Sequence, residues 1–147
     1  MEKTVTEYDQ DFLIWTQKQA EYLRKGHWEQ LDVNHLIEEL EALGRSEQRE
    51  FSSYFQRLVM HLLKWDYQPE RRTASWEITI ANCRDKIQDC LEDTPSLRRF
   101  LEDQDWIEKY YKRSRRDAAK ETKQPIESFP NYFPYTIEQV LDPEFLA

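Results

Sequence analysis

Glycine and cysteine are scarce, with two of each in a chain of 147 residues. Gly26 and Gly44 stand alone, so the sequence has no glycine-rich loop of the kind that cradles a phosphate. Cys83 and Cys90 are seven positions apart on a predicted helix, which separates their Cα atoms by about 10 Å, too far for a disulfide. No CxxC pair and no HExxH motif occurs. These absences remove the commonest signs of nucleotide, zinc and thiol chemistry.

Long apolar runs are missing as well. No stretch approaches the roughly 20 apolar residues that a membrane-spanning helix needs. The first ten residues, MEKTVTEYDQ, are polar and acidic, unlike a secretory signal peptide. We therefore expect a cytoplasmic protein with no membrane partner.

The charge is predominantly acidic. The formal net charge is −8, which disfavours nucleic acid and anionic lipid as partners because both repel an acidic surface. Residues 61–120 are the exception, with 13 basic and 12 acidic side chains. Any basic surface is therefore expected in this middle segment.

Apolar residues recur at helical spacing through most of the chain, and no alternating strand pattern is visible. Gly26 is expected to end the first helix, Gly44 to end or bend the second, Pro69 to stop the third, and Ser75 to cap the fourth. The predicted helices cover about residues 9–25, 32–43, 47–67, 75–91 and 104–122, with a short helix around 97–101.

The C-terminal segment differs in composition. Three of the six prolines fall in residues 125–134, among aromatic side chains, which predicts an extended arm that packs its rings on the helices and ends in a helical turn near 137–141. The predicted fold class is all-α: an antiparallel helical bundle of four to six helices with an extended Pro/aromatic C-terminal arm. We predict a single domain, 1–147, with a core at about 8–122 and the arm at about 123–147.

One group of polar residues is predicted to meet at the seam of the bundle. If residues 32–43 and 47–67 pair as antiparallel helices, Glu38 or Glu41 can approach His61, and Arg84 on the next helix can join them. The first interpretation is a structural hydrogen-bonded network, in which removing one member is costly. The same Glu38, Glu41 and His61 are the candidates for a metal or acid–base site, although the bundle di-metal pattern of two ExxH motifs is absent. The catalytic residues stay unknown, and we expect no cofactor.

A second candidate site is basic. The run KRSRR lies near Tyr110, Tyr111 and Trp106, and such a mixture of basic and aromatic side chains is typical of single-strand nucleic-acid binding. Helical spacing spreads these charges around the cylinder, however, which favours a solvated face. The patch would consist of Arg71, Arg72, Lys112, Arg113, Arg115 and Arg116.

The order of several blocks resembles a known family. The blocks are DFLIWTQKQAEYLRKGHWEQLDVNHLIEELEALGRSEQRE, HLLKWDYQPERRTASWEITIANCRDKI, TPSLRRFL, YKRSRRDAAKET and FPNYFPYTIEQVLDPEF. Over residues 8–145 the chain is similar to the bacterial, largely cyanobacterial, domain-of-unknown-function family number 29. Ser114 and Lys123 stand where members favour Ala and Gly. The resemblance implies a small helical domain and carries no catalytic assignment.

The sequence favours a protein-interaction or regulatory module, with a protein partner or self-association, and we do not expect an enzyme. A metal-binding or hydrolytic protein that uses the Glu/His cluster is the alternative. Weak nucleic-acid binding through the basic patch is the second alternative.

Overall fold

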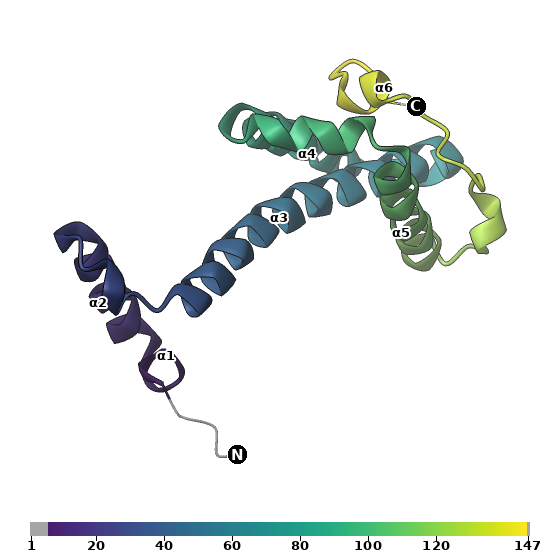
Figure 1. Ribbon diagram of the computed structural model, residues 1–147. Coiled ribbons are helices and arrows are strands. Elements are labelled where there is room, and N and C mark those ends of the chain that lie inside the picture. Colours follow the sequence, from purple (N-terminus) through teal and green to yellow (C-terminus); the bar gives the residue numbers. More distant parts are fainter. Residues whose placement is uncertain (1–5, 147) are drawn as a thin grey trace. The chain divides into compact units, whose positions relative to one another are not determined.

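Helices and short turns account for residues 6–146, the part of the chain that the computed structural model describes, and no strand occurs among them. This confirms the predicted all-α class. The α-helices are α1 Glu7–Gln10, α2 Phe12–Lys25, α3 Val33–Tyr67, α4 Ala74–Asp93, α5 Gln104–Thr122 and α6 Ile137–Leu141 (Figure 1). Four 3-10 helices connect them: η1 Trp28–Gln30, η2 Pro69–Arg71, η3 Pro95–Glu102 and η4 Ile126–Ser128.

The contacts divide the chain into two compact units, residues 1–46 and 47–147. The first unit contains α1, α2, η1 and the beginning of α3. The second contains the rest of α3 and everything after it. The single domain predicted over 1–147 stays a prediction, and the two units are described separately below.

Polar residues and one glycine fix several helix ends. The carboxylate of Asp11 accepts the Ile14 N–H at the start of α2, and Gly26 ends the helix in the left-handed region at φ 73°, where glycine is favoured. At α4 the side chain of Thr73, rather than the predicted Ser75, accepts the Trp76 N–H. Local capping rules therefore place most of the boundaries to within two or three residues.

Helix α3 corrects one prediction. Residues 33–67 form one helix instead of the expected pair 32–43 and 47–67. Gly44 lies on the exposed side of this helix with no atom within 4 Å of where a Cβ would stand. A solvent-facing glycine costs a helix only about 1 kcal/mol relative to alanine, which is too little to break it without a proline or a competing turn.

The second unit has an extensive core. Helices α3, α4 and α5 meet around side chains that are almost wholly excluded from solvent, and Figure 1 shows α4 and α5 beside the C-terminal half of α3. The ring of Trp106 adds an aromatic cluster by packing against Phe51, Phe55, Phe100 and Tyr110. The largest fully buried core side chains of these helices are Phe51, Phe55, Leu58, Val59, Leu62, Leu63, Ile80, Ile87, Ile107 and Tyr111.

The C-terminal arm packs on this core, as predicted. Phe129 and Val140 are buried, and the Tyr111 hydroxyl donates to the Pro130 carbonyl. Arg84 on α4 donates to backbone carbonyls of Gln139, Val140, Pro143 and Phe145 in the arm, with Nε 2.8 Å from the Val140 oxygen. The arm is thus fastened by rings at one end and by a buried guanidinium at the other.

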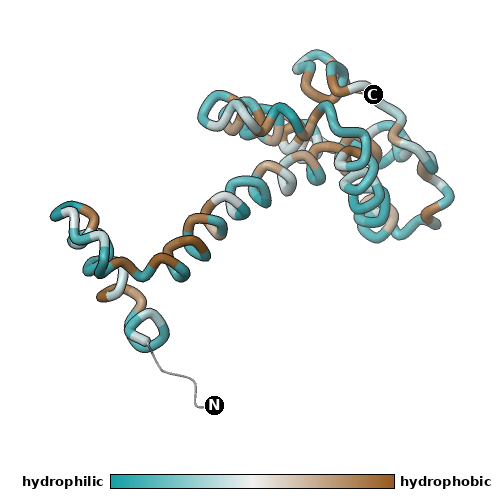
Figure 2. The backbone as a smooth tube through the Cα atoms, in the orientation of Figure 1, coloured by the Kyte–Doolittle hydropathy of each residue, from teal (hydrophilic) through white to brown (hydrophobic). Residues whose placement is uncertain are grey.

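The first unit buries very little. Only Trp15 and Gln19 are buried among its described residues. Several hydrophobic positions lie along α2 and the first turns of α3 (Figure 2), yet most of the large ones remain exposed. The same periodicity that builds a core in the second unit leaves an open apolar surface here.

Candidate functional site

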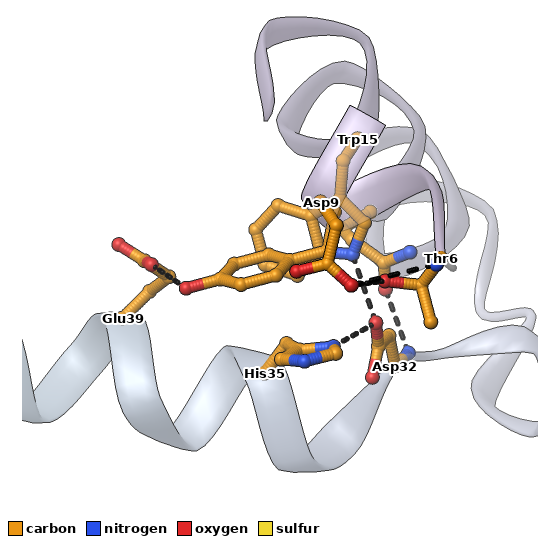
Figure 3. Close-up of polar contacts among 8 residues, drawn as sticks. Thr6, Asp9, Trp15, Asp32, His35 and Glu39 are labelled. Atoms are coloured by element: carbon orange, nitrogen blue, oxygen red, sulfur yellow. Dashed lines mark hydrogen bonds and ion pairs between the residues drawn. The ribbon is translucent and has the colours of Figure 1, made fainter. Parts of the chain in front are cut away.

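A cluster of polar contacts joins α2 to the start of α3. The Asp32 carboxylate accepts the indole N–H of Trp15 at 3.0 Å and lies 2.7 Å from His35 Nδ1 (Figure 3). The backbone N–H of Asp32 donates to the Gln19 side-chain oxygen at 2.8 Å. Asp32 therefore provides hydrogen-bond partners for two buried side chains of α2, Trp15 and Gln19. These bonds fix the position of the chain where α3 begins.

Tyr8 of α1 extends the cluster along α3. Its ring stacks on the His35 ring with centroids 3.9 Å apart and planes within 10°, and its hydroxyl donates to Glu39. The hydrogen bond to Glu39, partial burial and neighbouring carboxylates raise the pKa of Tyr8 to about 12. The hydroxyl therefore stays protonated at neutral pH and remains a donor.

The Asp32–His35 pair has electrostatic consequences. The hydrogen bond that His35 donates to the Asp32 carboxylate raises the pKa of His35 above its ordinary value, and partial burial opposes this only in part. Partial burial of Asp32 works against ionisation, but the hydrogen bonds from His35 and Trp15 outweigh it and lower the pKa of this carboxyl. Each group therefore favours the charged form of the other.

We predict that the stability of the first unit depends on pH. A raised folded-state pKa means that the contribution of His35 is fully present below 6.5 and is lost as the pH rises through the folded value. The Asp32 contribution is present above 3.8 and is lost as the pH falls through its lowered value. Amides of residues 6–46 should be better protected from hydrogen exchange at about pH 5.5 than at about pH 8, after correction for intrinsic exchange rates.

His35→Gln should abolish this difference, and His27→Gln, on the exposed loop, should leave it intact. A difference that persists in His35→Gln would contradict the assignment. The amides of the second unit are read separately because His61 there has the opposite tendency: burial lowers its pKa.

Beside the polar cluster, α2 and α3 enclose an apolar groove of about 450 Å³. Trp15, Gln19 and Glu39 belong to both features, so the cluster forms one end of the groove. Glu39 is its one charged lining residue. The complete lining is Phe12, Trp15, Thr16, Gln19, Ala20 and Leu23 from α2, with Leu36, Glu39, Leu40 and Leu43 from α3.

Exposed large apolar side chains are concentrated in the first unit, and four of them line the groove. Leu40 and Leu43, on the α3 wall, are each 66% exposed. Single exposed hydrophobic residues are ordinary on protein surfaces, whereas contiguous exposed apolar patches are uncommon. The first unit contributes nine: Phe12, Leu13, Ile14, Leu23, Trp28, Val33, Ile37, Leu40 and Leu43.

The structure does not bring the predicted Glu–His–Arg network together. Glu38 and Glu41 are exposed in the first unit, where Glu41 lies 3.9 Å from Arg45. His61 is in the second unit, with Nδ1 2.9 Å from the Arg57 carbonyl, and Arg84 binds the arm. The physical reason is the continuity of α3, because no helix pair turns residues 38–41 back towards His61.

The metal alternative needs those same side chains to converge. Within residues 6–146, no group of three or more His, Cys, Asp or Glu is arranged to hold a metal ion. Both cysteines are free, and burial raises the pKa of the Cys83 thiol, which disfavours the nucleophilic thiolate.

The basic residues of the second candidate site mostly have structural partners. Arg71 donates to the Thr122 carbonyl, and Arg72 donates to the Trp65 carbonyl and lies over the Trp65 ring. Arg115 donates to the Phe129 carbonyl and to Asn131, which helps to hold the arm. The remaining members are on the surface of α5: Lys112 is exposed, Arg113 lies over the Tyr110 ring, and Arg116 pairs with Asp117.

Sequence reasoning missed the roles of Tyr8, Trp15, Asp32 and Glu39. The contacts of Asp32 with Trp15 and Gln19 span 17 and 13 residues, so no local pattern predicts them. One local signal was available, because Asp32 and His35 are three positions apart and can pair on one turn. The contact between Tyr8 and Glu39 spans 31 residues and has no local signal.

The fold is all-α, and the first unit carries an open apolar groove between α2 and α3. The chain belongs to the family described as domain of unknown function DUF29, whose model matches residues 7–146. No curated protein and no solved structure matches it significantly. Among the helices that the structure describes, none is both long and apolar enough to cross a membrane.

Proposed function

We propose that the protein is an interaction module whose groove receives an amphipathic helix from a partner protein in the cytoplasm. The observation that carries this proposal is the apolar surface of the first unit, which its own residues leave open. Four of its nine exposed large apolar side chains, Phe12, Leu23, Leu40 and Leu43, line the groove itself.

A groove with exposed apolar side chains on two helical walls is the kind of surface that an amphipathic helix covers. The geometry also suits a helix, because α2 and α3 form two walls with leucine side chains on both. An added helix would present its own apolar stripe to those walls and complete a small bundle. The polar cluster supports this role by holding the two walls together through Asp32.

Leu40→Glu tests the proposal. The variant should bind a designed amphipathic peptide helix, with Leu at i, i+3, i+4 and i+7, at least tenfold more weakly than the natural protein. Such a loss corresponds to about 1.4 kcal/mol, within what one buried leucine contributes. Fluorescence anisotropy of the labelled peptide measures it.

The matched control is Ile78→Glu, since Ile78 is an exposed apolar residue of α4 in the second unit. It changes charge and hydrophobicity in the same way and should leave peptide affinity unchanged. Equal affinities for all three proteins would show that the groove is not the binding surface.

A further inference from the structure

The charges around the groove indicate which kind of helix it accepts, an inference that rests on the function proposed above. Between residues 33 and 44, α3 carries Glu38, Glu39 and Glu41 and no Lys or Arg. Glu39 lines the groove, and Glu38 and Glu41 are exposed on the same segment. The α3 wall is thus a leucine stripe accompanied by carboxylates.

The basic side chains of α2, which forms the opposite wall of the groove, are already paired with carboxylates. Lys18 lies 3.0 Å from Glu7, and Lys25 lies 3.2 Å from Glu21, which also pairs with Arg24. These pairs lie within the first unit and neutralise the basic side chains of α2. They are therefore poorly placed to attract an acidic partner.

The carboxylates of α3 are not matched in this way. Within the described residues Glu38 forms no ion pair, and Glu39 accepts only the neutral Tyr8 hydroxyl. Glu41 has Arg45 at 3.9 Å, the outer limit of an ion pair. The first unit, residues 1–46, has ten acidic and five basic side chains, a net charge of −5.

We propose that the groove selects a basic amphipathic helix, whose apolar stripe fills the groove while its Lys or Arg side chains are attracted by Glu39 in the lining and by the acidic surroundings that Glu38 and Glu41 create on the outer side of α3. A second copy of the chain fits less well, because two first units of charge −5 would repel one another. Anionic membranes and nucleic acids are disfavoured for the same reason.

Two labelled peptides with an identical leucine stripe test the proposal, one with Lys and Arg at every flanking position and one with Glu and Asp. Against the full-length protein, the basic peptide should bind at least tenfold more tightly at about 50 mM salt, because the net charge of −5 on the first unit attracts cations over distances that low salt screens only weakly. The preference should shrink several-fold at about 500 mM salt, since screening weakens exposed pairs.

The double variant Glu38→Gln/Glu41→Gln should reduce the preference for the basic peptide. The double variant Glu77→Gln/Glu92→Gln changes the net charge equally on α4 and should not. Glu39 is left unchanged because it holds Tyr8.

The outcomes separate the two proposals. Equal binding of both peptides, abolished by Leu40→Glu, would overturn the charge inference and leave the interaction function standing. Binding of neither peptide would overturn both. Sedimentation as a dimer that Leu40→Glu converts to monomer would identify a second copy as the occupant and also overturn the inference.

Discussion

Replacing Arg84 with methionine is expected to free the C-terminal arm and to lower the free energy of unfolding of the second unit by about 3 kcal/mol. Methionine keeps much of the length and apolar contact of the side chain and removes the guanidinium. Carbonyls of Gln139, Val140, Pro143 and Phe145 then lose a charged donor, and a buried acceptor without a partner costs about 1–3 kcal/mol. More than one such carbonyl is affected, which sets the size of the effect.

Urea denaturation measures the stability, and limited proteolysis within residues 123–146 reports release of the arm. Lys86→Met is the matched control, because Lys86 is an exposed cation on the same helix. It should change stability by less than about 0.5 kcal/mol. An arm that stays protected in Arg84→Met would show that ring packing alone, through Phe129 and Tyr135, retains it.

The sequence predicts most of the secondary structure, and each success has a local cause. Helix α5 occupies Gln104–Thr122 and α6 occupies Ile137–Leu141, close to the predicted limits. Asp103 caps the first of these helices and Thr136 the second. Such signals lie within a few residues of the structure that they determine, so they need no knowledge of the fold.

Gly44 shows where local reasoning fails. A glycine after a leucine stripe is a common helix end, and the alternative depends on whether anything stabilises a turn there. At this position the helix continues in solvent, and the predicted meeting of Glu38 or Glu41 with His61 depended on the turn. This one local error accounts for the missing Glu–His contact, whereas Arg84 is held by arm carbonyls 55 to 61 residues away that no local pattern predicts.

For the leucine stripe of α3, the sequence predicts the apolar face correctly but not its burial. Helical periodicity assigns Val33, Leu36, Ile37, Leu40 and Leu43 to one face, and the usual interpretation is a core. The structure confirms the face but leaves four of the five more than 45% exposed. Helical periodicity identifies an apolar face of a helix. Whether the same chain covers that face depends on how many other apolar faces the fold supplies.

Replacing Trp15 with alanine is expected to disorder the first unit. Trp15 is 4% exposed and is the one large apolar side chain that this unit buries among its described residues. Removing a buried tryptophan costs about 3–5 kcal/mol, and the Asp32 carboxylate also loses its indole donor. The few remaining contacts of a unit with so small a core cannot offset a loss of this size.

The second unit should survive this change, because its own core contains Phe51, Phe55, Leu58 and the other buried residues of α3, α4 and α5. Hydrogen exchange followed residue by residue should therefore show lost protection over residues 6–46 and retained protection over 47–146. The matched control is Trp28→Ala, at a tryptophan of the same unit that is 62% exposed, and it should leave both units protected. Loss of protection throughout the chain in Trp15→Ala would instead show one cooperative domain over 1–147, because only a shared unfolding transition carries a local loss across both units.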